Sequence, residues 1–159
     1  MLFGGTGVDS ASKTLPKTIP ERFEVGSLNT MAIAGLNASL KWIQAVGIEN
    51  IYDAEQSNHR TLLELLRQFP NIKIVPHKPN THSIGVVSCV FDGYGSDSIG
   101  QILSDKGIAV RTGLHCAPVA HHTLGTFPNG TVRFSLSYFI SDTDFEMLRV
   151  ALEYIYENS

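Results

Sequence analysis

The sequence has few of the features that identify secreted, membrane-bound or nucleic-acid-binding proteins. It contains only two cysteines, Cys89 and Cys116, so a disulfide framework is not what holds the fold together. The net charge of -3 leaves no basic surface for nucleic acid. No apolar run is long enough to cross a bilayer, and no secretory signal is recognisable at the start. We therefore expect a soluble cytoplasmic protein with neither a membrane nor a nucleic-acid partner.

What is present is typical of an ordinary globular domain. Hydrophobic residues make up 43% and charged residues 17% of the 159 positions. A chain of this length can bury a sizeable core as one domain. Residues 8–20 are polar and contain two prolines, and we interpret them as a loop.

Two helices are predicted in the first half. Asn29-Thr30 offers an N-cap, apolar residues then recur at helical spacing, and Gly47 ends the segment. A second helix is predicted from about residue 49 to 68, with Pro70 as its stop. Its core-facing side should carry Leu62, Leu63, Leu65 and Leu66.

The second half is predicted to alternate strands with helices. Strands are expected at 72–75, 83–91, 108–110 and 131–138, and helices at 97–106 and from Ser141 to the C-terminus. The run 83–91 is almost wholly apolar, as in a buried central strand, and should place Cys89 in the core. The pattern predicts an α/β fold with one sheet and helices packed on it.

The segment 112–130 is expected to be a long irregular loop, which is uncommon in a compact domain unless it has a function. In or beside it lie Arg111, His115, Cys116, His121, His122 and Arg133. The thiolate is the nucleophilic form of cysteine, and nearby cations or histidines lower a thiol's pKa. Arg111 and His115 are therefore predicted to support Cys116. The guanidinium fork of Arg133 suits a substrate carboxylate.

Several segments resemble cysteine desulfurases, of the class V aminotransferase fold type. The specific ones are VRTGLHCAP (110–118), GTFP (125–128) and TVRFS (131–135). Residues 20–29 resemble the family's segment between large and small domains, and residues 4–7 resemble its phosphate-binding loop. The resemblance implies the family's small C-terminal domain, with a short, mostly antiparallel sheet. It also implies that residues 1–28 are the tail of the large domain and the joining segment, and that 29–159 are the small domain.

The resemblance implies a role for each matching residue. Cys116 would take sulfur from L-cysteine as a persulfide and leave alanine. Arg133 would bind the substrate carboxylate, with Asn29 near the active-site mouth, and Arg111 and His115 would support the thiol. For Asn29 the alternative role of a helix cap is equally open, and for Cys116 the alternative is a small buried hydrophobe.

The resemblance also implies pyridoxal 5'-phosphate as cofactor and no metal. Gly5 and Thr6 would bind the phosphate of the other subunit in a homodimer. The lysine that binds the cofactor covalently is expected upstream of Met1, so we interpret the chain as part of a longer enzyme, inactive and unable to hold the cofactor alone. Expected partners are the small-molecule substrate cysteine, a second subunit and a sulfur-acceptor protein.

Other functions remain open at this point. A related enzyme of the same fold type, such as a selenocysteine lyase or an aminotransferase, would share this domain. A non-catalytic stand-alone domain would keep the fold and lose the chemistry. A metal-binding module could use Cys116 with His115, His121 and His122, although their spacing follows no zinc pattern.

Overall fold

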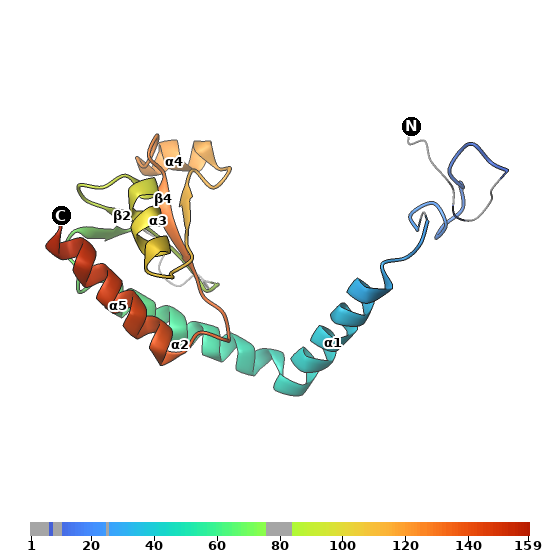
Figure 1. The fold of residues 1–159 in the computed structure, drawn as a ribbon, viewed down its shortest axis with the longest axis horizontal. Coiled ribbons are helices and arrows are strands. Elements are labelled where there is room, and N and C mark those ends of the chain that lie inside the picture. The colour runs from blue at the N-terminus through green and yellow to red at the C-terminus, as the bar shows by residue number, and fades with distance from the viewer. Residues whose placement is uncertain (1–6, 8–10, 25, 76–83) are drawn as a thin grey trace. The chain divides into compact units, whose positions relative to one another are not determined.

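A computed structural model describes residues 7, 11–24, 26–75 and 84–159 of the chain, which form two compact units, Met1–Gly47 and Ile48–Ser159 (Figure 1). The predicted domain boundary between residues 28 and 29 refers to the division of a whole enzyme and stays a prediction. Among the described residues, no helix is both long enough and apolar enough to span a membrane.

In the described part of the first unit, α1 (Thr30–Val46) is the one helix, and turns in residues 11–24 precede it. The helix begins where Asn29 accepts a hydrogen bond of 3.0 Å from the backbone N–H of Ala32, which satisfies one otherwise unpaired donor of the first turn. It ends at Gly47, whose φ of 88° an L-residue rarely adopts. The predicted helix is confirmed at both ends, and none of its residues is buried.

The second unit contains the remaining elements, and their order confirms the predicted α/β class. They are α2 (Ile48–Leu66), β1 (Ile72–Ile74), β2 (Val86–Phe91), α3 (Ser96–Asp105), β3 (Arg111–Gly113), α4 (Pro118–Leu124), β4 (Thr131–Ser135) and α5 (Asp142–Glu157). The strands form one sheet in the order β1-β2-β4-β3, and every neighbouring pair is antiparallel. The last helix begins with a capping box between Ser141 and Asp144.

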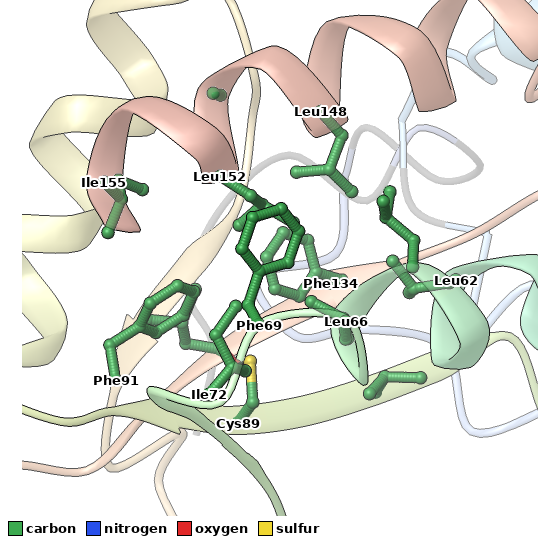
Figure 2. Close-up of a cluster of buried hydrophobic side chains, with 14 of the residues drawn as sticks. Leu62, Leu66, Phe69, Ile72, Cys89, Phe91, Phe134, Leu148, Leu152 and Ile155 are labelled. Atoms are coloured by element: carbon green, nitrogen blue, oxygen red, sulfur yellow. Dashed lines mark hydrogen bonds between the residues drawn. The ribbon is translucent and has the colours of Figure 1, made fainter. Parts of the chain in front are cut away.

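One face of the sheet carries the core. Because side chains alternate along a strand, Val87, Cys89 and Phe91 of β2 share a face, and all three are buried. Val132 and Phe134 of β4 are buried with them. Helices α2, α3 and α5, together with Phe69 and Ile72, supply the rest of this cluster. Figure 2 shows Leu62 and Leu66 of α2 and Leu148, Leu152 and Ile155 of α5 in this cluster with Cys89 and Phe134.

The opposite face of the same strands is more polar and positions the candidate site. In the β2–β4–β3 register, Ser88, Arg133 and Arg111 lie side by side across the sheet. Their neighbours along the strands on this face include Thr131 and Gly113, which are themselves paired. The core helices pack on the other face of the sheet, so this face is available for the candidate site.

The structure corrects three predicted segments. The strand expected at 108–110 is instead β3 at Arg111–Gly113, because these residues pair with β4, whereas Ile108 and Val110 pack against the core from outside the sheet. The expected loop 112–130 contains part of β3 and all of α4, which begins at Pro118 and ends at left-handed Gly125. In β2 only alternate residues are buried, so the strand is covered fully on one face.

Candidate active site

Cys116 lies at a tight turn between β3 and α4. The backbone N–H of Ala117 donates to the carbonyl of Leu114 over 2.8 Å and closes the turn. Its two central residues, His115 and Cys116, have φ of 50° and 60°, in the left-handed region that favours glycine. Cys116 is a free, exposed cysteine. The turn thus presents the thiol to solvent at a place where the backbone is strained.

Arg111 donates a hydrogen bond to this thiol. Its Nη2 lies 3.8 Å from the Cys116 Sγ and donates to it. The strand that carries Arg111 is held by its neighbours, since the Thr112 hydroxyl donates to Asp97 of α3 over 2.8 Å. The structure thus places a positively charged guanidinium in contact with the Cys116 sulfur.

Arg133 lies directly across the β3–β4 ladder from Arg111. Like charges opposite each other in an antiparallel pair destabilise the sheet. In addition, the Arg133 Nε is buried and has no hydrogen-bond partner in the described part of the chain. An unpaired buried donor next to a second guanidinium is an arrangement that an anion such as a carboxylate would satisfy.

His115 is bound to the sheet. Its Nε2 lies 3.0 Å from the Thr131 hydroxyl of β4, while its Nδ1 is buried without a partner among the described residues. Burial lowers the pKa of His115 below its usual 6.5, and the positive charges of Arg133, His121 and Arg111 lower it further. Among the described residues the hydrogen-bond partner of this ring is Thr131, and the supporting role predicted for His115 stays a prediction.

The two histidines of α4 have other contacts. His121 is buried, and its Nδ1 lies 2.7 Å from the Thr126 hydroxyl, whereas His122 stacks on Phe127 with ring centroids 3.9 Å apart. Within the described ranges, no three His, Cys, Asp or Glu side chains are grouped so that they could hold a metal ion. The metal-module alternative therefore gains no support from the described geometry.

The roles predicted for the other site residues stay predictions. Asn29 caps α1, where its side-chain oxygen accepts a hydrogen bond from the backbone N–H of Ala32. Gly5 and Thr6 lie outside the described residues. Thr131 was not singled out as a site residue, although its sequence position in TVRFS, between the cysteine loop and Arg133, could have drawn attention to it.

Cys89 gives a contrast to Cys116. It is fully buried in β2, and its thiol donates to the carbonyl of Val132 over 3.8 Å. Burial raises the pKa of Cys89 to about 12. The prediction that Cys89 belongs to the core is confirmed, and its thiol is chemically inert at neutral pH.

Comparison with known proteins places the chain among relatives of one kind. A cysteine desulfurase from Synechococcus elongatus is 36% identical over 149 residues, which cover 92% of this chain and 23% of that protein. One from Serratia proteamaculans is 38% identical over 117 residues, 72% of this chain and 28% of that protein. The chain thus spans about a quarter of the length of these two relatives.

Solved structures show the same fold. The apo cysteine desulfurase from Thermococcus onnurineus NA1 matches with a TM-score of 0.73 and 28% identity, over 100% of this chain and 39% of that one. The sequence model for class-V aminotransferases matches residues 1–148, nearly the whole chain. Together with the antiparallel sheet and its helices, this match shows that the chain belongs to the class-V aminotransferase family.

Proposed function

We propose that this chain is the thiol-bearing part of a cysteine desulfurase. The observation that carries the proposal is an exposed thiol, Cys116, within 3.8 Å of the Arg111 guanidinium, in a chain of this family. The relatives at 36% and 38% identity are both cysteine desulfurases. The complete activity belongs to a longer protein, because the chain spans only about a quarter of theirs.

Arg133 binds the α-carboxylate of L-cysteine in this proposal. A carboxylate between Arg133 and Arg111 would relieve the repulsion of two opposed guanidinium groups and satisfy the buried Nε. Binding the substrate at this end directs its side-chain sulfur toward the protein's own thiol.

Members of this family depend on pyridoxal phosphate, which supplies the electron sink for breaking bonds of a bound amino acid. The described lysines near the sheet and its helices are engaged elsewhere: Lys73 pairs with Asp92, and Lys106 stacks over Tyr154. The described residues therefore fit the substrate and thiol side of the site. The covalent anchor of the cofactor is expected in the remainder of the longer enzyme. The phosphate contacts stay assigned to Gly5 and Thr6 of this chain, which lie outside the described residues.

The thiolate of Cys116 attacks the sulfur of the bound cysteine. A sulfur–sulfur bond forms on Cys116 as the carbon–sulfur bond of the substrate breaks. The electron pair of that bond passes to the substrate carbon, which takes a proton and leaves as alanine. Arg111 stabilises the negative sulfur before the attack and the persulfide anion after it. The outer sulfur of the persulfide then passes to a sulfur-acceptor protein. The proposal also includes a homodimeric enzyme in the cytoplasm.

The test is production of sulfide and alanine from L-cysteine by the full-length polypeptide that carries this chain, with pyridoxal phosphate and a thiol reductant. Cys116→Ala should lower sulfide release by at least about 100-fold, because the acceptor nucleophile is gone. Persulfide on Cys116 should be detected by mass spectrometry in the parent after a single turnover.

Cys89→Ala is the matched control, because it removes the other thiol of the chain. It should lower the melting temperature, since a buried side chain is shortened, and leave sulfide release within about twofold of the parent. Sulfide release that survives Cys116→Ala, or that disappears equally in Cys89→Ala at a temperature where both are folded, would sink the proposal.

A further inference from the structure

The turn that carries Cys116 is unusual because neither of its central residues is glycine. His115 and Cys116 both have positive φ, at 50° and 60°. For L-residues other than Gly, Asn and Asp this region is unfavourable, and such residues persist there only when surrounding contacts hold them. Two consecutive examples therefore require a specific anchor outside the turn.

The anchor is found on strand β4. The Thr131 hydroxyl lies 3.0 Å from the His115 Nε2, and Thr131 is only 2% exposed. Its backbone is fixed by pairing with Gly113 at the end of β3. The bond thus ties the first central residue of the turn to the paired β3–β4 ladder.

We infer that Thr131 is a positioning residue for Cys116: its hydroxyl holds the His115 ring, and the ring holds the left-handed turn that sets the Cys116 sulfur beside Arg111. Without this bond, residues 115 and 116 are free to relax to negative φ. A change of that size rotates the direction in which the Cys116 side chain leaves the backbone. The sulfur then loses its place 3.8 Å from the Arg111 guanidinium.

The surroundings of His115 agree with this role. The cations Arg133 and Arg111 and the ring of His121 surround it, and no described carboxylate contributes to its titration. A ring in this setting is disfavoured as a cation and so is better suited to anchoring than to donating a proton to substrate. The inference deepens the proposed function, on which it rests for the identity of Cys116 as the sulfur acceptor.

The test measures alkylation of Cys116 by iodoacetamide in the chain itself, read by peptide mass spectrometry. Thr131→Val removes the hydroxyl and keeps the shape, and Thr131→Ser keeps the hydroxyl. We expect Thr131→Val to slow alkylation at pH 7 by roughly threefold to tenfold, because one hydrogen bond that positions the turn is lost. The rate for Thr131→Ser should stay within about twofold of the parent. Cys89 is buried and should remain unreacted as an internal control.

A double-variant experiment separates positioning from general loosening. Arg111→Gln should slow alkylation in the parent, but should add less than about twofold in the Thr131→Val background, where the contact is already lost. His115→Ala should slow alkylation as much as Thr131→Val does. If Thr131→Val does not fold, the alkylation rate of His115→Ala is the deciding measurement. His115→Gln, whose amide reaches the position of Nε2, should restore the parental rate.

An alkylation rate equal to the parent's in folded Thr131→Val, or in His115→Ala, overturns the inference. Alkylation of Thr131→Ser as slow as that of Thr131→Val overturns it as well. Additive effects of Arg111→Gln and Thr131→Val also overturn it. The measurement needs neither cofactor nor turnover of cysteine, so failure of the proposed function would leave its outcome unchanged.

Discussion

At the scale of single residues, the charge environment of His115 predicts how stability depends on pH. Burial and neighbouring cations lower its pKa in the folded state below 6.5, so the unfolded chain binds the proton more readily. This contribution to stability is fully present at pH values above the pKa that His115 has in the unfolded chain. It is lost as the pH falls through the lower pKa that His115 has in the folded state. Urea unfolding of the parent and of His115→Gln, at pH values on both sides of 6.5, measures it.

We expect the parent to lose more free energy of unfolding than His115→Gln as the solution is acidified. The other histidines and the carboxyl groups are common to both proteins, so the contributions of those that do not interact with His115 cancel in the difference. Equal pH dependence in the two proteins would show that His115 is not perturbed.

Arg133 gives a second prediction at this scale. Replacing Arg133 with Lys keeps the charge and removes the planar fork, so a carboxylate loses its paired hydrogen bonds. In the full-length enzyme the KM for cysteine should rise by about 10-fold to 100-fold, with a smaller effect on kcat. Steady-state kinetics measure both constants.

Arg149→Lys is the control for Arg133→Lys. Arg149 lies on α5, where it pairs with Glu146 and Glu153, and takes no part in the candidate site. Its replacement should leave KM within about twofold, because exposed ion pairs contribute little. A KM in Arg133→Lys as low as in this control would contradict the carboxylate role.

The candidate site residues could be named from the sequence, but their contacts could not. Cys116 and Arg133 stand out by residue type and by the segments that carry them. That Arg111, rather than His115, contacts the Cys116 sulfur depends on the strand register and on the turn geometry. Neither follows from the spacing of residues along the chain.

At the scale of elements, the junction of β3 and β4 depends on one glycine. Gly130 has φ of 71°, and a Cβ built on it would lie 2.2 Å from the backbone carbonyl of Gly113. Gly130→Ala should lower the free energy of unfolding by about 2–5 kcal/mol, because strain at positive φ adds to a clash with backbone that cannot move aside. Chemical denaturation measures the loss.

Gly93→Ala is the matched control, since Gly93 also has positive φ, at 83°, but nothing lies within 4 Å of a Cβ there. Gly93→Ala should lower the free energy of unfolding only by the conformational strain, about 1 kcal/mol. If the two variants were equally stable, close packing of Gly130 on Gly113 would not be what joins the strands. Partial separation of β3 from β4 in Gly130→Ala should also slow Cys116 alkylation, as Arg111 moves from its place.

The helices and the edge strand β3 differ in how far the sequence determined them. Caps and helical periodicity predicted α1, α2, α3 and α5 within two residues at most ends, since these signals are local. The strand β3 was displaced by three residues because its apolar neighbours Ile108 and Val110 resemble a strand. Its true position is chosen by hydrogen bonds to β4, about 20 residues later in the chain.

At the scale of the whole molecule, the buried hydrophobic cluster formed by the described residues lies in one of the two units. Every residue of the buried hydrophobic cluster lies between Leu62 and Ile155, and α1 buries none of its own. Residues 48–159 produced alone should therefore unfold in one cooperative transition, with a melting temperature within about 3 °C of the full chain. Calorimetry of the two proteins tests this.

A non-cooperative or strongly lowered transition in the shorter protein would show that residues 1–47 contribute to the core unit. One unfolding transition of the full chain, with a higher enthalpy than that of residues 48–159, would also show that residues 1–47 contribute to the core unit. Leu66→Ala, in the core of the unit, should lower both melting temperatures equally, at a cost of about 2–5 kcal/mol.

The sequence by itself determined the α/β class, most helices, the inert core position of Cys89 and the residue types of a thiol-based site. These depend on local periodicity, caps and composition, which a single chain displays directly. Only the tertiary structure decided that Arg111 faces Arg133 and that the Thr131 hydroxyl lies 3.0 Å from the His115 ring. Such contacts join segments separated along the chain, and they are fixed by the register of paired strands, which is set by packing of the whole sheet rather than by any one segment.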